Sequence, residues 1–444
     1  MPYSFYGGVH PPASKTLTLD RPSKRPHIPK KVILPLLQHT GSPAEPLVNT
    51  GDIVKVGQVI AKPSGLISSA VHASISGKVI KIDHHHTPLP AHPRVLSITI
   101  ESQDDEDQDL KLTPVKDVKS LSKEAMLDMI RDAGIVGLGG AAFPTHVKLS
   151  PPKNKPIDTV ILNGAECEPY LTCDHRIMLE KSNELFKALD IVIKILDAKE
   201  AFVAIEDNKL SAIYAMEQVL SKLRDSGRGK NINVVSLKTK YPQGAEKQII
   251  KSVLNRVVPA GGLPMDVGCI VLNAGTLYAI YEAVYLTKPL IERVVTITGS
   301  CVREPMNLWV RIGTRLESLT HLFGGFVKEP AKVIIGGPMM GVSQYAMDTP
   351  IVKGTSGVLF LSKNEVDRSE EGVCIRCGKC IEVCPMGLVP TTLMYRVKKE
   401  NFEEAGDLGI AHCYECGACA YACPAKIPLL DYMKYGKSKV IVQV

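Results

Sequence analysis

Two runs of cysteine near the end of the chain have a spacing that points to redox chemistry. The first begins at Cys374 and reads CIRCGKCIEVCP, and the second begins at Cys413 and reads CYECGACAYACP. Each has the pattern Cys-x2-Cys-x2-Cys-x3-Cys-Pro, which is typical of bacterial ferredoxins with two 4Fe–4S clusters. Zinc is the alternative for Cys-x2-Cys pairs, but a zinc site does not need two three-plus-one runs closed by proline. We therefore predict two 4Fe–4S clusters.

In a run of this kind, three cysteines bind one cluster and the fourth binds the other. This predicts two crossed ligand sets, which are Cys374, Cys377, Cys380 and Cys423 for the first cluster and Cys413, Cys416, Cys419 and Cys384 for the second. Four cysteines remain, and their scatter, without a secretory signal, argues against a disulfide framework. Three of them are expected to be small buried residues: Cys173, Cys269 and Cys301.

A glycine-rich stretch, GIVGLGGAAFPTHVK from Gly134 to Lys148, is the second candidate for chemistry. Gly137, Gly139 and Gly140 would let backbone amides approach a phosphate closely, and Lys148 could supply the counter-charge. The stretch is neither a G-x-G-x-x-G motif nor a P-loop. A helix end followed by a tight turn is the alternative interpretation.

The composition is that of an ordinary soluble protein of about three domains, with 444 residues, 45% hydrophobic and 22% charged. No run approaches the roughly 18 apolar residues of a membrane span, and the N-terminus lacks a signal-peptide pattern. We therefore expect a cytoplasmic protein that reaches a membrane only through a partner. The net charge is +7 but aromatic residues make up only 5%, which favours phosphate-bearing cofactors and acidic redox partners over nucleic acid.

The first hundred residues indicate an arm followed by a small β module. Residues 1–30 are rich in proline, glycine and lysine and are expected to be extended, whereas residues 31–100 contain short β-type runs punctuated by glycine. The second region resembles the barrel-sandwich fold of biotinyl and lipoyl carrier domains, but its hairpin tip, SGLISSAVHAS, has no lysine to modify. This predicts a structural docking module. His84 to His86 are expected to form a polar loop, with a metal site as the alternative.

The remaining segments predict a multidomain α/β protein. Residues 101–119 include the charge run ESQDDEDQD and are expected to be an acidic linker. Strands and helices alternate over residues 120–290, which predicts a Rossmann-like domain with ligands at the carboxyl ends of its strands. Residues 291–364 read as a β-grasp module with a connecting strand, and residues 365–444 as the helical two-cluster ferredoxin domain.

Three further stretches carry a resemblance to known flavoproteins. They are LNGAECEPY (162–170), YPQGAEKQ (241–248) and LNAGTL (272–277). Together with the glycine stretch they resemble, in order, the flavin and NADH loops of the NADH-binding flavoprotein subunit of respiratory complex I. The whole chain, from its opening YGGVHPPASK to the paired cysteine runs, resembles the RnfC family, the C subunits of Rnf electron-transport complexes.

The resemblance implies a site for non-covalent FMN and for NAD(H). The residues implied for the FMN phosphate and ribityl chain are Gly137, Gly139, Gly140 and Lys148, with Asn273 and Thr276 under the phosphate. Those implied to line the flavin site are Asn163, Glu166 and Glu168, and those beside the nicotinamide are Tyr241, Gly244 and Glu246. Glu168 and Glu246 would orient the nucleotide. Ala165, Ala245 and the Ala274-Gly275 pair depart from the complex I pattern, so nucleotide affinity or geometry is expected to differ.

The two kinds of site belong together for a physical reason. NADH gives two electrons as hydride while a cluster accepts one at a time, and a flavin is the usual carrier between them. The resemblance implies an NAD-reactive subunit on the cytoplasmic side of a membrane complex that couples electron flow between ferredoxin and NAD to ion movement. Its implied partners include an iron–sulfur subunit that receives electrons from ferredoxin. The alternatives are a diaphorase-type subunit of a soluble hydrogenase or formate dehydrogenase, and a non-enzymatic electron-wiring subunit.

Overall fold

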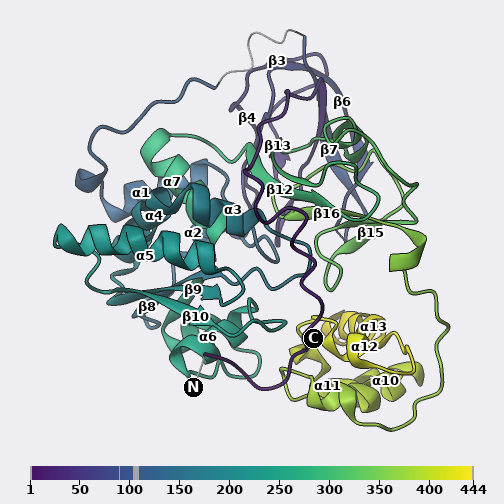
Figure 1. Cartoon of the computed structure of the whole chain (residues 1–444). Coiled ribbons are helices and arrows are strands. Elements are labelled where there is room, and N and C mark those ends of the chain that lie inside the picture. Colours follow the sequence, from purple (N-terminus) through teal and green to yellow (C-terminus); the bar gives the residue numbers. More distant parts are fainter. Residues whose placement is uncertain (1–2, 90, 104–109, 443–444) are drawn as a thin grey trace.

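The computed structural model describes residues 3–89, 91–103 and 110–442. Its four β-sheets and a helical C-terminal end are spread along the chain (Figure 1). We call them the two-sheet module (β1–β7), the parallel-sheet domain (α1–α7), the five-stranded module (β12–β16) and the C-terminal helical domain (α9–α13). No helix in the described ranges combines the length and the apolar character needed to cross a membrane.

The two-sheet module contains the strands that the sequence predicts for residues 31–100. One antiparallel sheet has the order β1 (Lys31–Pro35), β7 (Arg94–Glu101), β6 (Gly77–His86) and β3 (Ile53–Val54), and the other has β2 (Glu45–Pro46), β4 (Val59–Lys62) and β5 (Val71–His72). The prediction of a loop at His84 to His86 is wrong. These residues end β6 and pair with Leu96, Val95 and Arg94 of β7, because the long partner strand extends the ladder through them.

The predicted linker 101–119 starts at the last residue of β7 and ends in a 3-10 turn, η1 (Val118–Ser120). Most of its acidic run, residues 104–109, lies outside the described residues. Helix α1 (Lys123–Asp132) follows, and the Ser122 hydroxyl accepts a hydrogen bond from the Ala125 amide at 3.1 Å as its N-cap. Gly134 follows the helix with a φ of 67°, which agrees with the predicted stop.

The parallel-sheet domain has the strand order β10 (Ile232–Leu237), β9 (Glu200–Glu206), β8 (Thr159–Gly164) and β11 (Cys269–Asn273). Its helices are α2 (Thr145–Lys148), α3 (Cys173–Glu180), α4 (Ser182–Leu196), α5 (Leu210–Asp225), α6 (Glu246–Leu254) and α7 (Ala274–Leu286). From β8 the chain adds strands on one side and then returns to place β11 on the other. Ligands bind at such a reversal, outside the carboxyl ends of the strands. The site is therefore expected where β8 and β11 end.

One helix of this domain differs from the sequence interpretation. A single helix is expected near residues 176–190, but the structure has α3 and α4 with a break at Lys181. Lys181 has φ −132° and ψ 25°, outside the helical region. Both helices contact α5, α7 and β8, but α3 also contacts β12 of the five-stranded module, whereas α4 also contacts α1 and β9.

The five-stranded module follows the predicted order of strand, turn, strand and helix. Its sheet has the order β13 (Met306–Arg311), β12 (Glu292–Thr298), β16 (Gly357–Leu361), β14 (Lys332–Ile335) and β15 (Val342–Gln344), with α8 (Leu316–Thr320) beside it. A separate hydrophobic core lies under this sheet and includes Ile297, Phe323 and Phe360.

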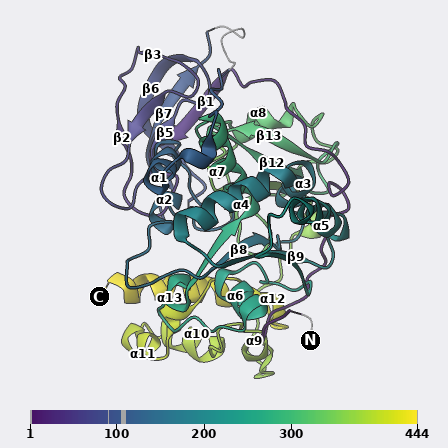
Figure 2. The same ribbon diagram turned by 90° about the vertical axis from the view of Figure 1, so that its left-hand side faces the viewer.

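The C-terminal helical domain consists of α9 (Lys379–Glu382), α10 (Pro390–Lys398), α11 (Phe402–Asp407), α12 (Ala418–Ala422) and α13 (Leu429–Val442). Its small core is formed by Leu393, Val397 and Met433 among others. Figure 2 shows α12 and α13 next to α6 of the parallel-sheet domain, with α10 and α11 farther away. One end of this domain is therefore turned toward the predicted site.

The N-terminal arm contacts the other parts of the protein in turn. Tyr3 forms a bridge with Leu237 of β10, Val9 with Tyr241, and Lys24 with Leu308 of β13. The Gly8 amide also donates to the Val383 carbonyl at 2.8 Å in the C-terminal helical domain. The arm thus connects the parallel-sheet domain, the C-terminal helical domain and the five-stranded module before β1 begins.

Candidate functional site

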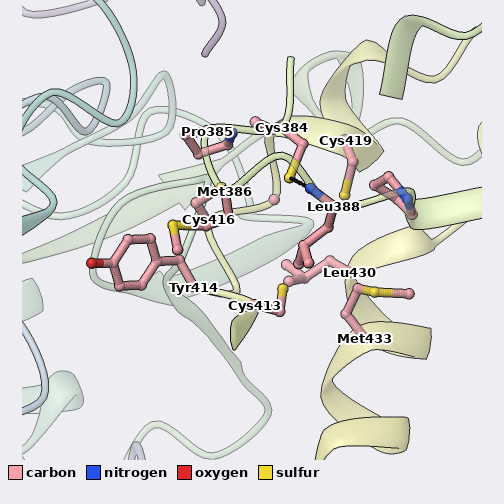
Figure 3. Close-up of a pocket in the computed structure, with 13 residues that line it drawn as sticks. Cys384, Pro385, Met386, Leu388, Cys413, Tyr414, Cys416, Cys419, Leu430 and Met433 are labelled. Carbon is pink, nitrogen blue, oxygen red and sulfur yellow. Dashed lines mark hydrogen bonds between the residues drawn. The ribbon is translucent and has the colours of Figure 1, made fainter. Parts of the chain in front are cut away.

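The eight cysteines of the two runs gather around two separate cavities. One is lined by Cys374, Cys377, Cys380 and Cys423, and the other by Cys384, Cys413, Cys416 and Cys419. In each cavity the fourth cysteine comes from the opposite run, which is the crossed arrangement that the spacing predicts. Figure 3 shows the second cavity, with its four cysteines drawn around it. We call these the outer and the inner thiol cavity.

The donor set of both cavities suits iron–sulfur clusters. Neither cavity has a carboxylate or an imidazole among its lining residues in the described part of the chain, so thiol sulfur is the donor that both offer. At the inner cavity the Leu388 amide donates to Cys384 Sγ at 3.4 Å and the Glu415 amide to Cys413 Sγ at 3.3 Å. Burial raises the pKa of the Cys416 thiol to about 11, and bound iron would offset this by favouring the thiolate.

The inner thiol cavity contacts the parallel-sheet domain directly. The Tyr241 hydroxyl donates to the Cys416 carbonyl at 2.7 Å, and the Lys247 amide donates to the Tyr414 hydroxyl at 3.3 Å. The Gln248 amide group reaches the Pro385 carbonyl at 3.3 Å. All three bonds come from the segment YPQGAEKQ, which the resemblance assigns to the nucleotide site.

The outer thiol cavity lies at the exposed end of the domain. Cys377 is exposed, and its neighbours Val373 and Ile375 have 87% and 67% of their surface in contact with solvent. Lys379 and Arg376 add positive charge to the same short segment. Glu370, Glu371 and Glu382 are exposed in the same stretch, so the feature that sets this end apart is its exposed apolar side chains beside a set of four thiols.

The glycine stretch forms a loop in which several backbone amides have no hydrogen-bond acceptor among the described residues. The Gly137 amide bonds the Phe143 carbonyl and the Leu138 amide bonds Thr276 Oγ1, both at 2.9 Å. Within the described residues, the amides from 139 to 142 donate no hydrogen bond to the protein. A Cβ on Gly139 would lie 2.5 Å from Asn273 Nδ2, whereas one on Gly140 would meet nothing within 4 Å. A run of free amides of this kind fits a phosphate group.

Two asparagines lie at the same level where β8 and β11 end. Asn163 and Asn273 are register partners. The Asn163 amide group donates to the Gly244 carbonyl at 2.8 Å, and the Asn273 side-chain oxygen caps α7 by accepting from the amides of Gly275 and Thr276. Asn273 Nδ2 also donates to Asp174 Oδ2 at 2.6 Å. The sequence-predicted Gly139, Asn163, Gly244, Asn273 and Thr276 are therefore brought together.

A buried carboxyl group at this point retains an unused oxygen. Asp174 Oδ1 has no hydrogen-bond partner among the described residues. Burial and the neighbouring Glu166 raise the pKa of Asp174. An unpartnered buried polar atom beside the ends of β8 and β11 fits a site that receives a polar ligand.

Lys148 and Glu246 form an ion pair across the crevice, from the end of α2 to the first residue of α6. Their side chains are 20% and 43% exposed. The predicted phosphate lysine and the predicted nucleotide-orienting glutamate are therefore each other's partner. Both side chains keep part of their surface exposed to solvent.

Two predicted glutamates have other partners. The Glu166 carboxylate accepts from the amides of Asp174 at 2.8 Å and His175 at 3.3 Å, and so holds the first turn of α3. The Glu168 carboxylate accepts from the amides of Met339 at 3.1 Å and Met340 at 2.8 Å in the five-stranded module. Burial raises the pKa of Glu168 to about 7. Glu168 thus joins two modules, and the flavin-lining role that the resemblance implies for it stays a prediction.

Tyr241, which the resemblance places beside the nicotinamide, bonds the C-terminal helical domain. Its side chain is almost fully buried and is turned to the inner thiol cavity. Its neighbours there are Val9 of the arm and Ala418 of α12. The sequence alone gives no signal for this, because the contact joins segments more than 170 residues apart.

Two lysines that were not predicted hold the loop after β8. Lys15 Nζ donates to the carbonyls of Glu166 and Glu168, both at 2.9 Å, and Lys209 Nζ donates to the Ala165 carbonyl at 2.6 Å. Both lysines are buried, and burial lowers the pKa of Lys15. They fix the backbone of AECEPY, and neither belongs to a recognisable motif.

The matches to known families agree with this geometry. Residues 130–282 match the Nuo51 FMN-binding domain and residues 373–427 a 4Fe–4S dicluster domain, while residues 3–106 match the RnfC barrel sandwich hybrid domain and residues 294–343 an SLBB domain. A multidomain α/β chain with an FMN domain and a dicluster domain is an oxidoreductase that carries electrons through a flavin and iron–sulfur clusters.

Relatives over the full length give the family. The chain is 48% identical over 98% of its length to the C subunit of the proton-translocating ferredoxin:NAD(+) oxidoreductase complex of Clostridium ljungdahlii, covering 94% of that protein. It is 41% identical to the C subunit of the Na(+)-translocating complex of Acetobacterium woodii, covering 99% of this chain and 98% of that protein. The chain belongs to the RnfC family, the C subunits of ion-translocating ferredoxin:NAD(+) oxidoreductase complexes.

A solved structure shares part of the fold. A chain of the NAD+-reducing NiFe hydrogenase in its H2-reduced state superposes with a TM-score of 0.51 at 17% identity, covering 75% of this chain and 65% of that one. The likeness concerns the fold alone.

Proposed function

We propose that this chain passes electrons between NAD(H) and ferredoxin-linked clusters as the NAD-reactive subunit of a membrane-bound, ion-translocating Rnf-type complex. The observation that carries the proposal is the direct contact between YPQGAEKQ and the inner thiol cavity. One short segment therefore borders both the crevice where β8 and β11 end and a set of four thiols. FMN bound in the crevice supplies the exchange between two-electron and one-electron chemistry.

The residues of the crevice have distinct tasks in this proposal. The free amides of residues 139–142 and the Lys148 ammonium bind the FMN phosphate, and Asn163 and Asn273 form the base of the site. Glu246 orients the nucleotide once Lys148 turns to the phosphate. No side chain acts as a nucleophile, so the protein contributes binding, orientation and exclusion of water.

In this proposal the electrons pass the two clusters in a fixed order. Cys384, Cys413, Cys416 and Cys419 hold the cluster beside the crevice, and Cys374, Cys377, Cys380 and Cys423 hold the one at the exposed end. The exposed apolar side chains around Ile375 suit the docking of an iron–sulfur partner that receives electrons from ferredoxin, and the net charge of +7 suits an acidic one.

The domain division supports a peripheral place in the complex. We propose an arm at 1–30, a barrel-sandwich module at 31–100, a linker at 101–119, an FMN/NADH domain at 120–290, a β-grasp module with its connecting strand at 291–364 and a ferredoxin domain at 365–444. The protein would lie on the cytoplasmic side and reach the membrane through other subunits, which carry the ion movement. The barrel-sandwich module and the relatives that match along the full chain favour this over a place in a soluble hydrogenase.

The proposal is tested by anaerobic purification followed by flavin extraction, iron analysis and titration with NADH. Two cubane clusters and one flavin predict about eight irons and one FMN per chain, with bleaching of the visible spectrum by NADH. A protein with clusters but without flavin and without a response to NADH would refute the enzymatic function and leave an electron-wiring role.

A further inference from the structure

Three carbonyl groups of the glycine loop are held by side chains from other modules. The Gly134 carbonyl accepts from Lys353 Nζ at 2.6 Å, and the Leu138 carbonyl accepts from Arg293 Nη1 at 3.0 Å. The Ala141 carbonyl accepts from the Thr40 hydroxyl at 2.7 Å. Arg293 lies in β12 and Lys353 just before β16, both in the five-stranded module, while Thr40 belongs to the two-sheet module. The loop is thus fixed from outside its own domain.

The two cations under the loop are buried without a direct carboxylate partner. Arg293 and Lys353 are 3% and 1% exposed. Among the described residues neither forms a salt bridge, and their other bonds go mainly to backbone carbonyls, such as Arg293 to Lys353 at 2.6 Å and Lys353 to Ala70 at 2.7 Å. Asp174 is the carboxyl group near enough to influence Arg293. Burying an unpaired cation is costly, so its presence here calls for a function.

Lys288, a buried lysine just before the five-stranded module, differs from Arg293 and Lys353 in having carboxylate partners. Lys288 is also buried, but it forms salt bridges with Glu282 at 2.6 Å and Glu292 at 2.7 Å. Its charge is therefore neutralised within the protein. The charges of Arg293 and Lys353 are instead directed to the backbone of one loop.

Gly134 leaves room for the Lys353 ammonium group beside the loop. A Cβ on Gly134 would lie 2.5 Å from the Ala70 carbonyl oxygen and 3.1 Å from Lys353 Nζ, and Gly134 has a φ of 67° that favours glycine. Three carbonyls of the loop are therefore bonded to side chains of other modules, while the amides of residues 139–142 donate to no described residue. A loop with bonded carbonyls and unused amides is suited to an anion.

We propose that Arg293 and Lys353 are positioning residues for the phosphate of the flavin. They hold the carbonyls of Leu138 and Gly134 by hydrogen bonds and so fix the backbone of the loop, and Arg293 places a positive charge beside it. This inference rests on the proposed binding of FMN at this loop. It makes the five-stranded and two-sheet modules part of the flavin site, whereas the sequence interpretation gives the two-sheet module a docking role only.

The test compares FMN with riboflavin, which lacks the phosphate. Affinities are measured by quenching of flavin fluorescence on protein from which flavin has been removed and which keeps about eight irons. Lys353→Met and Arg293→Met should each weaken FMN binding on the order of 10- to 100-fold and leave riboflavin binding nearly unchanged. Arg293→Lys retains the charge and should lie between wild type and Arg293→Met. Thr40→Val, at an exposed position, should cost a few-fold.

Lys288→Met is the matched control, because it removes a buried lysine that does not touch the loop. It should lower affinity for both flavins equally or for neither. Variants at 353 and 293 that keep the FMN-to-riboflavin ratio of wild type would overturn the inference, as would equal losses for both flavins. Should a methionine variant fail to fold, Arg293→Lys and Thr40→Val decide by the same ratio. Wild-type protein that binds both flavins equally would instead overturn the phosphate site itself.

Discussion

Replacing Tyr241 by phenylalanine tests the contact between the crevice and the inner thiol cavity. The substitution removes one hydroxyl, which donates to the Cys416 carbonyl at 2.7 Å, and keeps the ring that packs on Val9 and Ala418. Tyr241 is 1% exposed, so water cannot readily replace the lost donor. Leaving a buried acceptor unpaired costs about 1–3 kcal/mol.

That free energy predicts more frequent local opening of the segment that carries three ligands of the inner cluster. At about 1.4 kcal/mol per tenfold change, residues 413–419 should open roughly 5- to 150-fold more often. Hydrogen exchange followed by mass spectrometry on the iron-loaded protein measures this change. In parallel, the EPR spectrum of the reduced protein should change for one of its two clusters only, because the Tyr241 hydroxyl bonds the inner cavity and lies away from the outer one.

Tyr421→Phe is the control, since Tyr421 is 50% exposed and its hydroxyl makes no hydrogen bond with any described residue. It should leave both exchange and EPR as in wild type. Unchanged exchange at 413–419 in Tyr241→Phe, or equal changes at both clusters, would refute the reasoning that this hydroxyl anchors the inner cavity.

Three further changes test the site. Cys384→Ser should lower the iron content from about eight to about four per chain, because it removes a ligand of the inner cluster. Adding Cys413→Ser should remove no further iron, whereas adding Cys374→Ser should remove nearly all of it. The reverse pattern would argue against crossed ligation. Lys148→Ala should weaken FMN retention on gel filtration with iron unchanged, because its ammonium serves the crevice alone; loss of iron would contradict the domain division. Glu168→Gln should flatten the pH dependence of thermal unfolding. Folding raises the pKa of Glu168 from 4.5 to about 7, so the folded protein binds this proton more tightly than the unfolded chain does. The free energy of unfolding of the wild type should therefore fall by up to about 3 kcal/mol as pH rises from 4.5 to 7. A rise in the free energy of unfolding over that window would contradict this.

The sequence predicts the features whose signal is local. The cysteine spacing anticipates which residues share a cavity, because three cysteines within one turn-like run can face one side only while the fourth points away. Ser122 and Gly134 mark the start and end of α1 through backbone chemistry that needs no distant partner. Apolar runs predict the parallel strands β8, β9 and β11, which are largely buried on both faces.

Features that depend on partners far apart in the chain could not be predicted from the sequence. Glu168 reads as a flavin-lining residue but bonds the amides of Met339 and Met340, which lie 171 and 172 residues away. His84 to His86 look like a polar loop because histidine carries little strand preference, yet β7 supplies the partner that makes them a strand. The break at Lys181 likewise has no local signal, and it accompanies contacts with distant elements that differ between the two helices, β12 for α3 and α1 and β9 for α4.

The same distant contacts explain how one chain can hold a crevice and two cavities at fixed separations. Glu168, which follows β8, accepts a hydrogen bond from the Met339 amide. The Met339 carbonyl oxygen in turn lies 3.1 Å from the position of a Cβ built on Gly417, at the start of α12. The five-stranded module thus stands between the crevice and the inner cavity, while Tyr241 and Gln248 join them directly. Two independent connections between the same two sites resist both sliding and hinging. Weakening one of them should loosen the inner cavity without releasing it, whereas losing both should free the C-terminal helical domain from the crevice.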